Sequence, residues 1–387
     1  MTTISEMKKI ICITAALLIA VANLLGQNKS AGINLSIWKN VATQPLDSTQ
    51  STWFNLGLQS TVNRLNGVGI NVLAGVARQN MNGVQLSGLA NIAGNHMRGV
   101  QLSGISNVNG NNTVGLSVTG MVNIAGNNVK GVLLSGLTNI AGDNSRGLMV
   151  GGLTNITGEK GIGMQLAGIS NIAGSTFDGL MSAGLLNVVG GTLNGVQLSG
   201  LGNITGKQLN GVQISLFNFA TRANGLQIGL VNYYKDEMKG FQLGLINANP
   251  DTRIQMMVFG GNSTKTNVAV RFKNKRFYTI VGGGTHYLDF SDKFSAALFY
   301  RGGLWLPICK DLSISGDLGY QHIETFKNRH YNIPARLYAL QARINLEYQI
   351  TKKFGVFATG GYGNSRIYNG NASYDKGMIA EAGIVLF

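Results

Sequence analysis

The sequence predicts an all-β protein in which a β-solenoid of 16-residue repeats is followed by an antiparallel β-barrel of about eight strands. Three observations support this. Glycine supplies 55 of the 387 residues but proline only 4. One motif returns every 16 residues through the middle of the chain. The last 116 residues alternate apolar and polar side chains and hold 20 of the 30 aromatic residues.

The charged fraction limits where the apolar residues can go. Charged residues make up 12% of the chain, against roughly 25% in typical soluble domains. We therefore expect tight stacking of repeats, or lipid, to accommodate the apolar side chains. The expected organisation has four parts: a signal peptide at 1–27, N-terminal strands entering the array at 28–66, tandem repeats at 67–250, and an antiparallel barrel-like region at 251–387.

The N-terminus has the pattern of a secretory signal. Lys8 and Lys9 precede an apolar run over 10–25, which is shorter than the roughly 20 residues that a membrane-spanning helix needs. A basic start, an apolar stretch and small residues near its end are typical of an exported protein. We expect cleavage near Gly26 or Gln27. Only Cys309 would then remain, which rules out an internal disulfide bond.

Eight gap-free repeats cover residues 83–210, with a weaker copy from Gly67 and shortened copies from Gly211, Gly225 and Gly240. The consensus is G-V-Q-L-S-G-L-x-N-I-x-G followed by four variable residues, numbered here as positions 1 to 16. Position 9 is asparagine in every repeat, and we predict that these residues form a structural ladder: Asn91, Asn107, Asn123, Asn139, Asn155, Asn171, Asn187 and Asn203.

The charges of the repeats fall in positions 13 to 16. They are Arg98, Lys130, Asp143, Arg146, Glu159, Lys160, Asp178 and Lys207. This distribution predicts that positions 13 to 16 form an exposed turn, and that the other twelve positions are ordered and mostly shielded. A helix is disfavoured, because each of the two or three glycines per repeat would cost it about 1 kcal/mol.

Two β architectures fit the repeat. In a solenoid, each repeat is one coil, the glycines make corners that need positive φ, and stacked asparagine amides bond to one another. In the alternative, one large β-barrel of about 18 strands includes the repeats, and Val84 and Leu86 face lipid. We favour the solenoid for two reasons. Residues 55–216 contain one aromatic residue, Phe177, although spanning strands carry aromatic girdles. Antiparallel strands would also not align identical columns.

The C-terminal region predicts about eight strands between Arg253 and Phe387. Its clearest alternation spans 336–350, where Gln341, Arg343, Asn345, Glu347 and Gln349 oppose an apolar face. Tyrosines near both ends of that face are typical of a lipid-facing strand. The face comprises Tyr338, Leu340, Ala342, Ile344, Leu346, Tyr348 and Ile350. Eight strands make the smallest usual barrel, which side chains fill. A soluble β-sandwich or lipocalin-like barrel stays open as an alternative.

The chain ends in a strand that closes on Phe387, which resembles the export signal of bacterial outer-membrane β-barrels, although Glu381 departs from an ideal apolar face. The motifs GVQLSGLANIAG, GLQIGLVNYY and GFQLGLIN and the strand-rich tail resemble the surface-repeat proteins of Bacteroidetes and spirochaetes over residues 50–387. That resemblance implies the cell envelope, at the outer membrane or cell surface of a Gram-negative bacterium. It implies no molecular activity.

We identify no catalytic site, cofactor site or metal site, and expect no enzyme. The four histidines are His96, His286, His322 and His330. The spacing of His322, Glu324 and His330 matches no usual zinc pattern. A polysaccharide-cleaving β-helix would need clustered carboxylates. The acidic residues of repeats 83–210, however, are Asp143, Glu159 and Asp178, which we place in turns at different slots.

The net charge of +15 raises the question of an anionic partner. Basic residues are scattered and are densest in a predicted turn at Arg271, Lys273, Lys275 and Arg276. For an exported chain, the outer membrane, with the phosphates of lipopolysaccharide, is a better candidate than nucleic acid. The expected function is a non-enzymatic structural or display protein that could bind an envelope or host partner through its repeat turns. The alternative is an outer-membrane pore formed by one large barrel.

Overall fold

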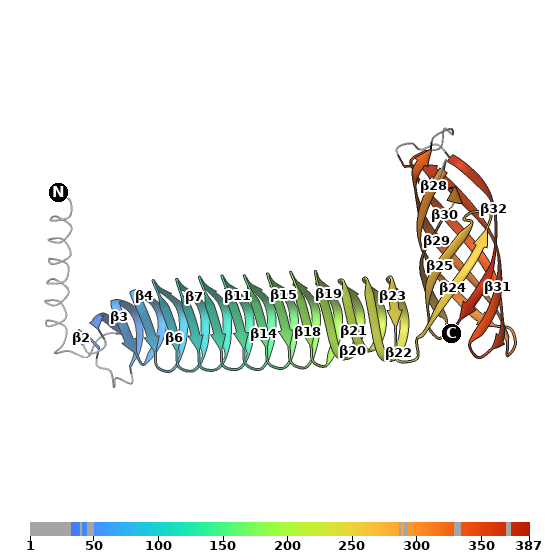
Figure 1. The fold of residues 1–387 in the computed structure, drawn as a ribbon. Helices are drawn as coiled ribbons and strands as arrows, with labels where there is room; N and C mark the ends of the chain where they lie inside the picture. The colour runs from blue at the N-terminus through green and yellow to red at the C-terminus, as the bar shows by residue number, and fades with distance from the viewer. Residues whose placement is uncertain are drawn as a thin grey trace. The chain divides into compact units, whose positions relative to one another are not determined.

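The computed structural model describes residues 32–38, 41–44, 50–285, 288–289, 293–328, 334–368 and 373–387. Within these residues the chain is all β, with no helix, and Figure 1 shows stacked coils followed by a barrel. No helix of the described part is long and apolar enough to cross a membrane. The expected signal peptide at 1–27 lies outside the described residues. The described residues form two compact units: those up to Ser215 with Phe219–Gly225, and Leu216–Asn218 with those from Leu226 onward.

Each regular repeat forms two strands. A long strand covers positions 15 and 16 of one repeat and positions 1 to 5 of the next, and a short strand covers positions 8 to 11. The long strands are β5 (Met81–Ser87), β7 (Met97–Ser103), β9 (Thr113–Thr119), β11 (Val129–Ser135), β13 (Ser145–Gly151), β15 (Gly161–Ala167), β17 (Phe177–Ala183) and β19 (Thr192–Ser199). The short strands are β6 (Ala90–Ala93), β8 (Ser106–Asn109), β10 (Val122–Ala125), β12 (Thr138–Ala141), β14 (Thr154–Thr157), β16 (Ser170–Ala173) and β18 (Leu186–Val189).

Longer or irregular strands flank this regular part. They are β1 (Ile33–Trp38), β2 (Val41–Ala42), β3 (Ser51–Val62), β4 (Arg64–Ala77), β20 (Gly202–Ile214), β21 (Phe217–Ile228), β22 (Val231–Leu243) and β23 (Ile246–Ala248). Strand β1 already pairs in parallel with β3, and β3 with β4. The parallel ladder therefore begins upstream of Gly67, in the segment that we expected to lead into the array.

Neighbouring coils pair in parallel and in register. Gly131 on β11 lies opposite Gly147 on β13, and Asn139 on β12 lies opposite Asn155 on β14. The result is a β-solenoid of about twelve turns. The prediction of a solenoid is confirmed, and the alternative of one large barrel that includes the repeats is wrong, because such a barrel requires antiparallel neighbours in this region.

The glycine columns follow from close stacking of the coils. At position 1 the backbone has positive φ, for example +139° at Gly131. A Cβ atom there would lie 2.0 Å from the carbonyl oxygen of Gly115 in the preceding coil. Both the positive φ and the space exclude other residues. At position 6 a Cβ on Gly136 would meet the carbonyl oxygen of Gly120 at 2.0 Å, so the close approach alone requires glycine there.

The C-terminal strands close into an antiparallel barrel. Its eight main strands are β24 (Arg253–Gly261), β25 (Thr266–Lys273), β26 (Phe277–Thr285), β28 (Lys293–Pro307), β29 (Leu312–Asn328), β30 (Arg336–Thr351), β31 (Phe354–Ile367) and β32 (Ser373–Leu386). Pairing of β24 with β32 and of β26 with β28 completes the ring. The two-residue strand β27 (Leu288–Asp289) pairs with β28. The prediction of about eight antiparallel strands is confirmed.

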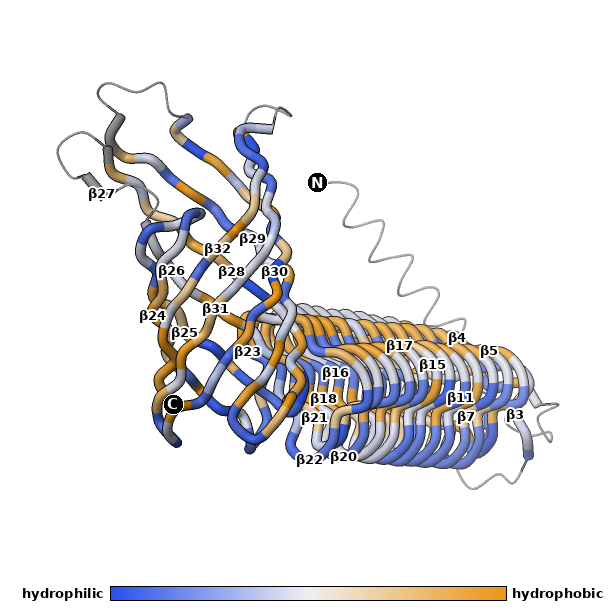
Figure 2. Tube along the Cα trace, turned by 90° about the vertical axis from the view of Figure 1, so that its right-hand side faces the viewer, coloured by the Kyte–Doolittle hydropathy of each residue, from blue (hydrophilic) through white to orange (hydrophobic). Residues whose placement is uncertain are grey.

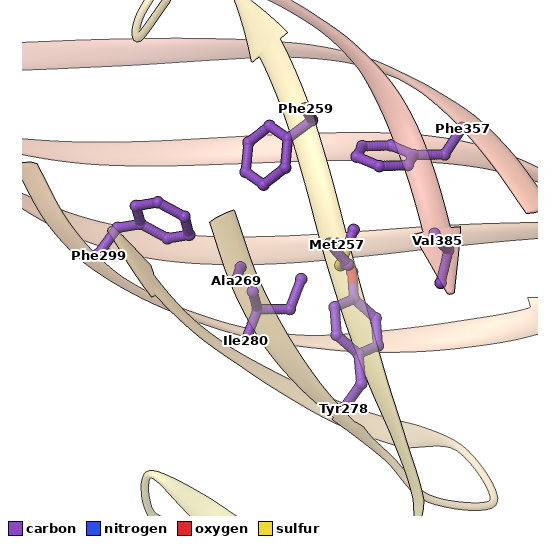
Figure 3. Close-up of a cluster of buried hydrophobic side chains, with 8 residues drawn as sticks. All are labelled: Met257, Phe259, Ala269, Tyr278, Ile280, Phe299, Phe357 and Val385. Atoms are coloured by element: carbon purple, nitrogen blue, oxygen red, sulfur yellow. The ribbon is translucent and has the colours of Figure 1, made fainter. Parts of the chain in front are cut away.

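Aromatic and aliphatic side chains occupy part of the barrel interior. Figure 3 shows this cluster, which consists of Met257, Phe259, Ala269, Tyr278, Ile280, Phe299, Phe357 and Val385. The rings of Phe299 and Phe357 each meet Phe259 edge to face, with centroids 5.8 and 5.7 Å away. Side chains from six strands thus meet inside the barrel, as expected for a barrel of this size.

Candidate functional surfaces

The structure brings the eight predicted asparagines together in one column inside the solenoid. All eight are 0–1% exposed. The amide nitrogen of each donates to the amide oxygen of the next over 2.8–3.1 Å, from Asn91 to Asn203. The second amide hydrogen is also used: Asn139 donates to the carbonyl oxygen of Val150 at 2.8 Å. Burial of these polar groups is therefore compensated by hydrogen bonds in every coil.

The prediction that positions 13 to 16 form an exposed turn is wrong for positions 15 and 16. The turn covers positions 12 to 14, and position 15 lies on the long strand and points inward. Met97, Phe177 and Leu193 at this position are 0–1% exposed. The residue type at position 15 varies from repeat to repeat, which led the prediction to place it in the turn. Inside the solenoid this position holds uncharged side chains of different sizes. A usable signal existed, since position 15 holds no charge in any repeat.

The expectation that the first twelve positions are mostly shielded holds only in part, because positions 3, 9 and 11 are buried whereas positions 6, 7 and 12 are exposed in most repeats. Residues alternate along each strand. Position 3, which is glutamine in four of the eight repeats, and the asparagine at position 9 are buried, so positions 2, 4, 8 and 10 point outward. Position 7 lies at the turn between the two strands. Figure 2 shows apolar residues along one edge of the coils and polar residues along the opposite edge.

Two acidic residues of the repeats share a slot, contrary to our expectation. Asp143 and Glu159 both occupy position 13 of adjacent coils, where the amide of Glu159 donates to the carbonyl oxygen of Asp143 at 2.7 Å. Asp178 lies on β17 and pairs with Lys160 at 3.0 Å. The Asn194 amide, which donates to Asp178, and the Lys160 ammonium together lower the pKa of the Asp178 carboxyl.

The barrel has an apolar outer surface. On β30 the predicted division is confirmed, because Leu340 and Ile344 point outward and are 61% and 64% exposed, whereas the opposite face is buried except near its end. The outward row lies between Tyr338 and Tyr348. Ten residue steps at about 3.4 Å, on a strand tilted by about 40°, correspond to about 26 Å along the barrel axis.

The barrel interior holds buried charges in pairs. The Arg271 guanidinium donates to both carboxylate oxygens of Glu347, at 2.6 and 3.0 Å. Arg301 donates likewise to Glu381, at 2.8 and 3.1 Å. Both pairs are bidentate, the strongest form of this contact. The sequence suggested that Glu381 interrupts the apolar outer face of the last strand. The structure shows that it does not. It points inward and is 4% exposed.

The predicted basic turn is only partly a turn. Lys275 and Arg276 lie between β25 and β26 and are exposed. Arg271 lies on β25 with its side chain buried in the barrel. Lys273, at the end of β25, lies 3.6 Å from Glu347 and 4.0 Å from the ring centre of Trp305. The four residues do not form one basic patch, because Arg271 and Lys273 both point to Glu347, whereas Lys275 and Arg276 are exposed in the turn.

The histidines do not converge in the described part of the chain. His96 lies in a solenoid turn, and His322 contacts Glu324 at 3.5 Å on β29. His286 and His330 lie outside the described residues. Among the described residues, no group of three or more histidine, cysteine or acidic side chains is placed to hold a metal ion.

Comparison with known sequences adds no relative: no protein-family model matches the chain, and no curated protein matches it.

Proposed function

We propose that this chain is a non-enzymatic protein of the outer membrane of a Gram-negative bacterium, whose barrel spans the membrane and whose solenoid presents its polar turns to a partner. The fold of a solenoid followed by a barrel is compatible with a structural or surface protein. The observation that carries the proposal is the polarity of the barrel, which is charged inside and apolar outside. Leucines are exposed on its outer surface, and the buried charges are Arg301, Glu381, Arg271 and Glu347.

The dimensions of the outer surface favour lipid over water. The apolar row of about 26 Å between two tyrosines agrees with the roughly 25 Å band of membrane barrels. A soluble lipocalin-like barrel would bury Leu298, Leu318 and Met378, which are instead 68%, 72% and 84% exposed. Exposure of so large an apolar surface is rare in monomeric soluble proteins.

The polar turn edge of the solenoid supports a display role. Side chains at positions 13 and 14 vary from coil to coil, while the backbone that carries them repeats. Variable residues on a fixed scaffold suit recognition of a protein, a glycan or the phosphates of lipopolysaccharide. We do not propose a pore formed by one large barrel, because the repeats pair in parallel.

The test is to express the full chain in a Gram-negative cell and fractionate the envelope. We expect the protein in the outer-membrane fraction, with a gel mobility that changes when the sample is heated, because folded membrane barrels resist detergent until heated. Release of the folded chain as a soluble periplasmic protein would defeat the proposal. Binding of the purified chain to lipopolysaccharide, compared with a neutral glycan, then tests the partner class.

A further inference from the structure

A column of apolar side chains runs along the edge of the solenoid formed by position 7. Over the eight regular repeats this edge column consists of Leu89, Ile105, Met121, Leu137, Leu153, Ile169, Leu185 and Leu201. Leu137 is half-buried, and the other seven are 41–50% exposed. At about 4.8 Å per coil, eight residues span roughly 34 Å. No charged residue interrupts the column.

Outward positions on both sides widen this apolar edge, although position 8, next to the column, is serine or threonine in four of the eight repeats. Position 4 on the long strand is leucine, valine or isoleucine in nearly every repeat, and position 10 on the short strand is isoleucine or valine. The charges lie at the other end of the coil, as with Glu159 at position 13 and Arg146 at position 16. Each coil is therefore amphipathic across its width, and in-register stacking repeats that polarity from coil to coil.

The backbone donors and acceptors of neighbouring coils already bond to one another along the stack. The edge column therefore offers a partner only apolar contact. A partner must therefore present a long apolar surface without matching polar groups. Hydrocarbon chains at a membrane interface meet this requirement. A protein partner would need its own apolar ridge at the same spacing. A second copy of this solenoid would supply such a ridge.

Within the unit Leu226–Phe387, outward apolar side chains of the last coil face the outside of the barrel. Phe241 and Leu243, at positions 2 and 4, line a cavity of about 700 Å³ together with Leu304, Leu318 and Leu340 of the outer barrel wall. Two hydrogen bonds hold the coil there: the hydroxyl of Tyr300 donates to the carbonyl oxygen of Gly244 at 2.7 Å, and that of Thr279 donates to the carbonyl oxygen of Leu245 at 3.0 Å.

We propose that the edge column of the solenoid is a second membrane-contacting surface, which inserts into the acyl region of a lipid bilayer while the charged turns stay in water. This inference rests on the proposed function, because the apolar surface of the last coil borders the barrel wall that would face lipid. The solenoid then lies along the bilayer surface as a β counterpart of an amphipathic interfacial helix, and presents only its polar edge to other partners.

The test measures lipid contact at opposite edges of one coil. In a full chain that carries Cys12→Ser and Cys309→Ser, single cysteines replace Leu153 on the edge column, Glu159 on the polar edge, or Leu298 on the barrel wall, which is 68% exposed. Each variant receives an environment-sensitive nitrobenzoxadiazole dye and is reconstituted into phosphatidylcholine–phosphatidylglycerol vesicles. Half of the preparations contain acyl chains brominated near the headgroup, which quench the dye on contact. Far-UV circular dichroism checks folding, and Ile169→Cys gives a second probe on the edge column.

We expect bromine to lower the emission from positions 153 and 169 by about half, and to leave position 159 unchanged, because an interfacial element reaches about 5–10 Å into the bilayer. Quenching at 298 without quenching at 153 and 169 would overturn the inference and leave the membrane barrel standing. Absence of quenching at all three would overturn both. The dye at position 153 could instead report an apolar environment without quenching by bromine, and this effect could grow as the protein-to-lipid ratio rises. That result would assign the edge column to contact with a second copy of the chain, and it would also overturn the inference.

Discussion

The solenoid and the barrel both bury polar side chains and expose apolar ones, but they compensate the buried polar groups differently. In the solenoid, Asn139 bonds to Asn155, its equivalent 16 residues later. In the barrel, Arg301 bonds to Glu381, 80 residues away. The solenoid uses neutral amides that are both donor and acceptor, so one residue type can pair with copies of itself. The barrel uses charges, each of which requires a different, complementary partner.

This difference predicts that the two regions tolerate variation differently. The repeats shorten after Gly211, yet the asparagine column continues from Asn218 to Asn232 and Asn247, with amide hydrogen bonds of 2.9 and 2.8 Å. A self-complementary column needs only one asparagine per coil at the right place. A charged pair in the barrel depends on two strands at once, and on the register between them.

The largest expected effect therefore comes from removing one charge of a barrel pair. Arg301→Met would leave Glu381 buried with only Arg343 nearby, at 3.4 Å. We expect a loss of about 3–5 kcal/mol, seen as a lower temperature for the heat-induced gel shift. The double variant Arg301→Met with Glu381→Gln should regain much of that loss. A double variant as unstable as the single one would show that packing, and not the charge, is responsible.

A charge on the outside of the barrel should have the next largest effect. Leu318 is 72% exposed at mid-strand, and Leu318→Arg should cost about 2–4 kcal/mol if this face meets lipid. The measurement is the folded fraction after reconstitution into vesicles over a urea series. Asn128→Arg, in a solenoid turn, is the control and should fold as the unmodified chain does. Equal folding of both variants would contradict a lipid-facing barrel.

Interruption of the asparagine column should have a smaller and more local effect. Asn139→Ala removes one donor and acceptor from a chain of amides and leaves the neighbouring groups of Asn123 and Asn155 unpaired, which should cost about 2–3 kcal/mol. Hydrogen exchange measured by mass spectrometry should show faster exchange in the adjoining coils, with barrel peptides unchanged. Asn144→Ala is the matched control, since the Asn144 amide bonds to Asn128 at 2.8 Å in an exposed column. Equal effects of the two variants would mean that burial does not matter.

The smallest effect should come from the exposed ion pair of the solenoid. Lys160→Ala removes the partner of Asp178 at 3.0 Å and should cost about 0–1 kcal/mol. The pKa of Asp178 is lowered in the folded chain by the Asn194 amide and by Lys160. Its stabilising contribution is therefore present above the unfolded pKa of about 3.9 and is lost as the pH falls through the lower folded pKa.

The pH dependence of the unfolding midpoint measures this contribution. We expect a small difference between the variant and the unmodified chain at pH 7 in low salt, which shrinks in acid and in 1 M salt. A difference that is independent of pH and salt would indicate lost packing of the Lys160 side chain instead of a lost charge interaction.

Some features were predictable from the sequence because they depend on short-range repetition. The 16-residue step predicts parallel coils, since identical residues can stack only in register, and the invariant position 9 predicts the column from Asn91 to Asn203. Alternation over 336–350 predicts which side chains of one strand share a face. Each of these inferences needs only a period and the geometry of a β-strand.

The tertiary structure alone decided which side of each coil is the interior. The usual rule places apolar residues inside, and here Leu153 lies outside while Asn155 lies inside, because stacked amides satisfy one another only once the coils assemble. The structure also paired Arg301 with Glu381, since closure of the barrel sets the register between strands distant in sequence. Period and alternation determine the β elements of this protein. Which face is buried, and which charges meet, depend on contacts that exist only in the assembled coils and the closed barrel.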